Sequence, residues 1–208
     1  MPIFMKDQHR VLFVHVPKTG GTSVEQVFQR AGYRTFYKDG SAGRHTINAV
    51  RRNTPQHLHA APLRELFTLS RFDVVFMLVR EPLARFRSEY AMRMAEGGQT
   101  DAESVGRWAD DVLGQYAENP HVLDNHLRPQ SEFYLPGSLV YRLEDGIAPV
   151  IHDLNQRLGL GLGPQAPRAM AAKGIASDDV KVSPELRQRL HAMYHADFER
   201  FGYSAERS

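Results

Sequence analysis

Two apolar segments, each followed at once by signals for a helix, place the strongest constraint on how this 208-residue chain folds. The segments are residues 10–16 and 72–79, and both are rich in Val, Phe and Leu. Strands buried on both faces have such sequences, as in a parallel sheet that is covered by helices. Amphipathic stretches with helix-ending glycines follow within residues 17–32 and 81–98. Two strand–loop–helix units of this kind predict an α/β fold with a doubly wound parallel sheet flanked by helices.

The length of the chain predicts a single domain that spans residues 1–208. Residues 38–56 and 160–177 contain scattered glycines among polar residues or prolines, and we expect both to be loops. A further strand is predicted at residues 139–143. The remaining helices are predicted at residues 62–69, 102–116, 122–127, 148–158 and 184–201.

The composition excludes several classes of protein. The chain contains no Cys, which rules out a disulfide scaffold, a thiolate zinc site and a cysteine nucleophile. Its apolar stretches are far shorter than the roughly 18 residues of a membrane span, and the N-terminal segment lacks the features of a signal peptide. The formal net charge of +2 is too small to indicate nucleic acid as a partner. We therefore expect a cytoplasmic protein with neither a membrane nor a nucleic-acid partner, and the oligomeric state stays open.

The segment between the first predicted strand and its helix carries the strongest chemical signal. It consists of Pro17, Lys18, Thr19, Gly20, Gly21, Thr22 and Ser23. The two glycines allow a ligand to approach the backbone, and the first N–H groups of a helix form an anion site. Lys18 adds a full positive charge, and the hydroxyl groups add donors. The pattern differs from the Walker A motif, in which the lysine follows the last glycine.

The sequence PKTGGTS after a first strand resembles the phosphosulfate-binding loop of the sulfotransferases, which use 3′-phosphoadenosine 5′-phosphosulfate (PAPS) as the donor. The resemblance implies a P-loop-like form of the predicted α/β fold. It also implies that Lys18 contacts the 5′-phosphosulfate near the bridging oxygen. By the same resemblance, residues 20–23 would surround the 5′-phosphate.

A second signature of this family is a strand that ends in Arg, with a Ser about eight residues later in the next helix. Here the strand ends before Arg80, Pro82 opens the helix, and Ser88 lies within it. The resemblance implies that Arg80 and Ser88 bind the 3′-phosphate of the nucleotide. An Arg at this position also has a simpler interpretation, because it often pairs with a neighbouring carboxylate such as that of Glu81.

Sulfuryl transfer to a hydroxyl requires a base that takes the hydroxyl proton. His57 and His59 are two residues apart, so on an extended segment their side chains would point to the same side. The spacing resembles the His-x-His of the uronyl 2-O-sulfotransferases, which implies His59 as the base with His57 in support. Three alternatives stay open: a structural role, two metal ligands, or a carboxylate base elsewhere in the cleft.

The C-terminal half adds weaker signals. The sequence HLRPQ resembles a stretch of the Golgi-type carbohydrate sulfotransferases, which implies that Arg128 and Gln130 contact the acceptor. Lys173 and Gly174 resemble a segment that covers the 3′-phosphate in cytosolic sulfotransferases. Aromatic residues near the end of the chain, and Trp108, are expected to pack in the core rather than to bind the nucleotide.

The sequence thus predicts a soluble bacterial-type sulfotransferase that moves a sulfuryl group from PAPS to a hydroxyl, most simply of a carbohydrate, without a metal. One alternative is a P-loop kinase or nucleotide hydrolase that uses Mg-ATP. That class expects a lysine after the glycines and a metal-binding acid at a strand end, and the chain has neither. The other alternative, a non-catalytic protein of the same fold that binds a nucleotide or a sulfated glycan, stays open.

Overall fold

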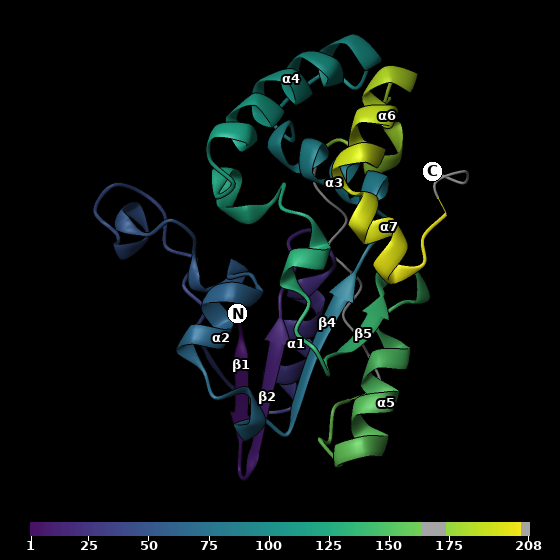
Figure 1. Ribbon diagram of the computed structural model, residues 1–208. Coiled ribbons are helices and arrows are strands. Elements are labelled where there is room, and N and C mark those ends of the chain that lie inside the picture. The colour runs from purple at the N-terminus through teal and green to yellow at the C-terminus, as the bar shows by residue number, and fades with distance from the viewer. Residues whose placement is uncertain (164–173, 205–208) are drawn as a thin grey trace. The chain divides into compact units, whose positions relative to one another are not determined.

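The structure, a computed structural model, describes residues 1–163 and 174–204 (Figure 1). Contacts divide the chain into two compact units. Unit 1 comprises residues 1–79 and 132–170, and unit 2 comprises residues 80–131 and 171–208. The assignment of residues 1–208 to one domain stays a prediction.

Unit 1 contains a five-stranded sheet in the order β3-β1-β2-β4-β5. The strands are β1 (Ile3–Lys6), β2 (His9–Val14), β3 (Arg34–Phe36), β4 (Val74–Val79) and β5 (Leu139–Arg142). Strands β2, β4 and β5 are parallel, and β1 pairs antiparallel with both β2 and β3. The α/β prediction is therefore confirmed, and the parallel sheet extends into an antiparallel edge.

Strands β1 and β3 were not predicted because both are short. Lys6 pairs with His9 across a two-residue turn, in which Asp7 adopts a left-handed φ of 51°. Asp is one of the few residues other than Gly that tolerates this conformation. The turn sequence Asp-Gln lacks the glycine that usually marks such a hairpin, so the sequence gives only a weak signal for it.

One hydrophobic cluster of unit 1 lies on the face of the sheet that carries Phe13 and Phe76. Phe4 stacks on Phe28 with ring centroids 4.1 Å apart, and Phe13 stacks on Phe76 at 4.9 Å. Helices α1 (Gly21–Arg30) and α5 (Ala148–Leu158) bury their apolar residues in this cluster: Val24, Val27, Phe28, Val150, Ile151 and Leu154. The packing places the N-terminus of α1 directly after the turn that follows β2.

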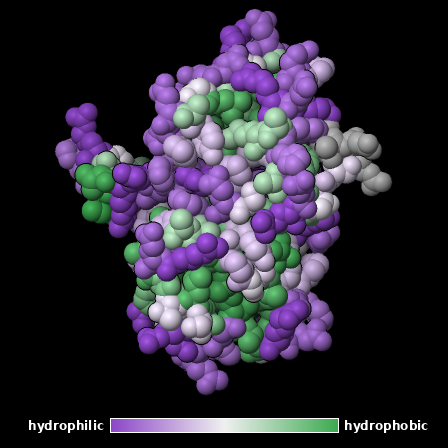
Figure 2. All heavy atoms as spheres, in the orientation of Figure 1, coloured by the Kyte–Doolittle hydropathy of each residue, from purple (hydrophilic) through white to green (hydrophobic). Residues whose placement is uncertain are grey.

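The rest of unit 1 is built from short elements. Helix α2 spans Ala60–Leu66, so it begins two residues before the predicted start. The predicted loop at 38–56 contains the 3-10 turn Ile47–Val50 and the start of a second one, Pro55–His57. Val50 is 81% exposed and Ile47 is 54% exposed. In Figure 2 hydrophobic side chains accordingly appear on this segment, at the left of the view.

Unit 2 is helical in its described residues. Its longer helices are α3 (Pro82–Arg93), α4 (Ala102–Glu118), α6 (Pro184–Met193) and α7 (His195–Phe201). The predicted core role of the aromatic residues is confirmed. Trp108 packs on Phe86 and Tyr90, and the buried set of the last segment comprises Tyr194, Phe198 and Phe201.

Two helix predictions in unit 2 are confirmed only in part. The helix predicted to run to residue 201 is interrupted at Tyr194, where ψ is 16° and α7 begins. The helix predicted at 122–127 is reduced to the 3-10 turn Val122–Asn125, which is distorted because Leu123, Asp124 and Asn125 adopt left-handed φ angles of 50°, 58° and 64°. Local propensity did not indicate this conformation, since only Gly visits it without cost.

Among residues 1–163 and 174–204, no helix is both long enough and apolar enough to cross a membrane.

Candidate active site

The turn after β2 opens the N-terminus of α1. Lys18 has a left-handed φ of 69°, and Gly20 has a φ of 84° and occupies the N-cap of α1. No side chain in the described part of the chain caps this helix. The N–H of Ser23 donates to the carbonyl oxygen of Gly20 at 3.0 Å, so an anionic ligand would meet the N–H groups before it, those of Gly21 and Thr22. The geometry suits the predicted phosphosulfate loop.

The three hydroxyl groups predicted to line this loop differ in their surroundings. Thr19 is fully buried, and its Oγ1 donates a hydrogen bond to the carbonyl oxygen of Val16, 2.8 Å away. Thr22 is exposed in the first turn of α1, and Ser23 is buried. The Thr19 hydroxyl therefore stabilises the loop through a buried hydrogen bond. Thr22 is the more accessible hydroxyl donor for a ligand.

Gly21 is required because the side chain of His15 fills the space beside it. A Cβ atom on Gly21 would lie 1.9 Å from Nε2 of His15. His15 directly follows the end of β2 and stacks on Phe13, with ring centroids 5.3 Å apart. We did not select His15 from the sequence, although it lies two residues before the predicted loop.

The buried carboxylate of Glu25 lies between the His15 ring and the partly exposed Lys38. Nδ1 of His15 lies 3.4 Å from Oε1 of Glu25, and Oε2 of Glu25 contacts Nζ of Lys38. Burial lowers the pKa of His15 to about 4, although Glu25 partly opposes this. Burial raises the pKa of Glu25, but its bonds to His15 and Lys38 outweigh this and keep the pKa below its usual value. At neutral pH the ring beside Gly21 is therefore uncharged.

This packing predicts a large stability effect at Gly21. We expect Gly21→Ala to lower the free energy of unfolding by about 1–3 kcal/mol, the usual cost of overpacking a buried site. The loss in the double variant with His15→Ala should be smaller than the sum of the two single losses, because removing the ring removes the clash. Urea unfolding of the four proteins measures this coupling. Gly106→Ala in α4 is the control, since nothing lies within 4 Å of that Cβ position. Equal unfolding midpoints for Gly21→Ala and the parent would contradict the packing argument.

His57 and His59, the two histidines predicted to supply the base, also lie in unit 1. His57 ends a 3-10 turn, Pro55–His57, and only Leu58 and His59 have extended backbone angles. The His57 ring meets the His15 ring edge-on, with centroids 5.0 Å apart. His59 has extended backbone angles, is half-buried and occupies the N-cap position of α2. The structure thus brings His57 against the ring that supports the loop and places His59 at the start of a helix.

In unit 2, the backbone of Arg80 is held by Gln130. The amide N–H of Arg80 donates to Oε1 of Gln130 at 2.9 Å, and Nε2 of Gln130 donates to the carbonyl oxygen of Arg80 at 2.7 Å. Gln130 is fully buried, and its side-chain amide is used on the Arg80 backbone. The carboxylate of Glu81 accepts from the N–H groups of Leu83 and Ala84, which makes it the cap of α3.

The other predicted residues of unit 2 lie on the same elements. Ser88 is half-buried in α3. Arg128 is buried, and its guanidinium group donates to Oδ1 of Asn125 and to the carbonyl oxygen of Pro120. Lys173 lies outside the described residues. The turn at Arg80 and helix α3 together have the strand-end arrangement that the second family signature requires.

The profile of the sulfotransferase family matches residues 1–204. The chain belongs to the sulfotransferase family. No curated protein and no solved structure matches it. The protein is accordingly a PAPS-dependent transferase, and its acceptor is not specified by family membership.

The sulfotransferase also contains a buried carboxylate–imidazole pair in unit 2 that sequence reasoning missed. Oε2 of Glu89 lies 2.6 Å from Nδ1 of His126, and Nε of Arg93 donates to Oε1 of Glu89 at 2.8 Å. Burial raises the pKa of Glu89, but the hydrogen bond with His126 and the nearby positive charges outweigh this and bring it to about 2. The only sequence signal was the position of Glu89, directly after Ser88.

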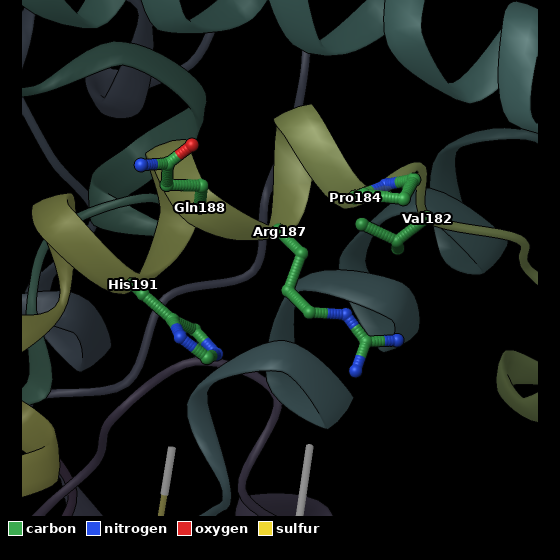
Figure 3. Close-up of a pocket in the computed structure, with 5 residues that line it drawn as sticks. All are labelled: Val182, Pro184, Arg187, Gln188 and His191. Carbon is green, nitrogen blue, oxygen red and sulfur yellow. The ribbon is translucent and has the colours of Figure 1, made fainter. Parts of the chain in front are cut away.

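Unit 2 of the sulfotransferase has a separate cavity of about 460 Å³ along α6, shown in Figure 3. It is lined by Val182, Pro184, Arg187, Gln188 and His191. Figure 3 shows the Arg187 and His191 side chains extending from the same side of the helix. None of the predicted site residues is among these five, so the cavity does not enter the proposed mechanism.

Proposed function

We propose that this sulfotransferase transfers the sulfuryl group of PAPS to a hydroxyl group of a carbohydrate. The observation that carries the proposal is the open N-terminus of α1, preceded by Lys18 and Gly20 in left-handed conformations. In the reaction the acceptor oxygen forms a bond to sulfur, and the bond from sulfur to the 5′-phosphate oxygen breaks. The hydroxyl proton passes to a base, and adenosine 3′,5′-bisphosphate leaves.

The donor-binding roles follow from charge and position. Lys18 meets the negative charge that develops on the bridging oxygen as the bond to sulfur breaks. The N–H groups at residues 20–23 surround the 5′-phosphate, with Thr22 and Ser23 as further donors. Arg80 and Ser88 bind the 3′-phosphate, and Gln130 supports this site through the Arg80 backbone. No metal ion takes part in the proposed reaction.

The proposed base is His59, with His57 in support. A histidine has an ordinary pKa near 6.5, so it can take a proton at neutral pH. His57 contacts the buried His15 ring beside the phosphosulfate loop, which supports placing this pair of imidazoles on the side where the donor reacts. The position of His59 at the start of α2 gives its side chain a fixed backbone.

The part of the proposal that concerns the acceptor is supported by the family resemblance and by the loops. Residues 38–56 begin at Lys38, whose contact with Glu25 ties this loop to α1. Loops that are positioned by a rigid scaffold commonly define the substrate. Arg128 is a weaker candidate for an acceptor contact, because two of its guanidinium nitrogens already donate hydrogen bonds within unit 2.

Thermal unfolding with two nucleotides tests the donor. Adenosine 3′,5′-bisphosphate should stabilise the protein, by about 2.7 kcal/mol at a concentration 100 times its dissociation constant. Mg-ATP at the same concentration should give no comparable shift, because the chain lacks the Walker lysine. Stabilisation by Mg-ATP alone would contradict the proposal and favour a kinase or nucleotide hydrolase.

A transfer assay with labelled PAPS tests the acceptor class. Methyl hexosides, methyl hexuronides, a phenol and simple alcohols form a suitable panel, with label counted in the organic product. We expect the carbohydrates to be sulfated in preference to the phenol. Preference for the phenol would contradict the carbohydrate assignment, and binding of the bisphosphate without transfer to any compound would favour the non-catalytic alternative.

A further inference from the structure

The loop of residues 38–56 in unit 1 exposes two aliphatic side chains. Val50 is 81% exposed and Ile47 is 54% exposed, and the 3-10 turn that they delimit has no buried residue. In a 3-10 helix, side chains three residues apart lie on the same side, so Ile47 and Val50 form one apolar pair. Single exposed aliphatic residues are common on protein surfaces, whereas an exposed pair on one side of one turn is a candidate contact surface.

Polar contacts, and not a hydrophobic core, hold this loop in shape. Nδ2 of Asn48 donates to the carbonyl oxygen of Asp39 at 2.9 Å. Nη1 of Arg51 donates to Oδ2 of Asp39 at 3.1 Å and to Oδ1 of Asn48 at 2.9 Å. The N–H of Asp39 donates to Oε1 of Gln56 at 3.1 Å, which joins the two ends of the loop. The turn is therefore preformed, and its polar side chains face the rest of the loop while the apolar pair remains in water.

The same loop concentrates positive charge. Residues 38–56 contain four basic residues and one acidic residue, a formal net charge of +3. The whole chain has a net charge of +2, so the residues outside the loop sum to −1. Lys38 and Arg51 take part in ion pairs. Arg44 and Arg52 are exposed, and neither forms an ion pair with another residue in the described part of the chain.

The size and chemistry of this surface decide which partner it fits. A stable protein–protein interface buries about 800 Å² on each side, which takes roughly 20–30 residues, and this turn offers far fewer. An acidic polymer would pair with the arginines but would leave the apolar pair in water. A bilayer with anionic lipids suits both, because inserted aliphatic side chains and basic side chains near the headgroups each add to the binding energy.

We propose that the 38–56 loop docks this sulfotransferase on an anionic lipid surface. Ile47 and Val50 insert at the boundary between the headgroups and the acyl chains, and Arg44 and Arg52 pair with anionic headgroups. The sequence alone predicts no membrane partner, because its apolar stretches are too short for a span. Docking on a surface needs no span, since it uses a few side chains that a preformed loop presents.

Co-sedimentation with vesicles tests the docking. The parent protein is mixed with vesicles of phosphatidylcholine alone, or of phosphatidylcholine and phosphatidylglycerol in equal amounts. We expect binding to the mixed vesicles at low salt and its loss at high salt, because salt screens the contacts with the headgroups. No PAPS or acceptor is present, so the outcome is independent of the transfer reaction. Absence of binding to the mixed vesicles, or equal binding to both kinds, would overturn the proposal.

Two double variants separate the contributions of charge and apolar surface. Arg44→Gln with Arg52→Gln should weaken binding roughly 30-fold, which is about fivefold for each charge near the surface. Ile47→Ser with Val50→Ser should weaken it at least about tenfold, because the new side chains no longer favour the apolar interface. All four side chains are exposed, so the thermal unfolding midpoints should stay close to that of the parent.

Matched controls lie outside the loop in the same unit. Arg30→Gln with Arg64→Gln removes the same charge from exposed positions. Leu66→Ser removes an aliphatic side chain that is 54% exposed, as Ile47 is. Both controls should bind the mixed vesicles like the parent protein. Losses equal to those of the loop variants would overturn the proposal, since binding would then depend on overall charge or on general hydrophobicity.

A fluorescent label locates the contact. The chain contains no Cys, so Val50→Cys and Leu66→Cys can each be labelled at one position with a nitrobenzoxadiazole group. With mixed vesicles, the label at position 50 should gain emission and shift to the blue, whereas the label at position 66 should not. Binding without a response at position 50 would place the contact elsewhere and reject the proposal. Binding of heparin that depends on Arg44 and Arg52, without binding of vesicles, would instead identify a glycan-binding loop.

Discussion

Replacing His59 with Ala should lower kcat for sulfuryl transfer by about 10²–10⁴-fold, the usual contribution of a general base. The acceptor hydroxyl would then keep its proton while it attacks sulfur, which raises the barrier. Binding of adenosine 3′,5′-bisphosphate should stay unchanged, because His59 lies at the start of α2 and not in the loop that precedes α1. Initial-rate kinetics and thermal unfolding with the bisphosphate measure the two effects.

His152→Ala is the control for this variant, since His152 is an exposed histidine on α5 of the same unit. It should leave both kcat and bisphosphate binding unchanged. A normal kcat for His59→Ala would contradict the assignment, and His57→Ala would then be measured next. A loss of bisphosphate stabilisation in His59→Ala would show that the side chain acts on the donor or on folding.

Replacing Lys18 with Met should lower kcat by about 10²–10³-fold, the effect of removing one donor that stabilises developing charge. The methionine keeps the length of the side chain, whereas the positive charge at the bridging oxygen is lost. The affinity for PAPS should fall as well, since the charge also attracts the bound donor. Single-turnover kinetics at saturating PAPS separate the chemical step from binding.

The left-handed φ of Lys18 places equal backbone demands on Met, so the fold should be retained. Lys181→Met, at an exposed lysine of unit 2, is the control for loss of one positive charge. If Lys18→Met weakens binding of PAPS but leaves the single-turnover rate unchanged, Lys18 binds the donor without taking part in catalysis.

Local sequence determined the parts of this protein whose structure depends on neighbouring residues. The apolar runs of β2 and β4 specify buried parallel strands, and the glycines after β2 specify a turn that leaves the N-terminus of α1 open. Neighbouring residues likewise specify the end of β4 before Arg80 and the start of α3 at Pro82. These patterns were sufficient to predict the α/β fold and the family to which the chain belongs.

The tertiary structure alone decided which side chains support the predicted site. His15 fills the space beside Gly21, and Gln130 holds the backbone of Arg80 from a distance of 50 residues in the chain. The Glu89–His126 pair joins α3 to a segment whose helical sequence pattern was misleading. The His15 contact is one of close packing, and the other two contacts share a different physical reason. Burial makes an unsatisfied polar group costly, so buried groups take partners wherever the fold supplies them, and such partners leave no periodic pattern in the sequence.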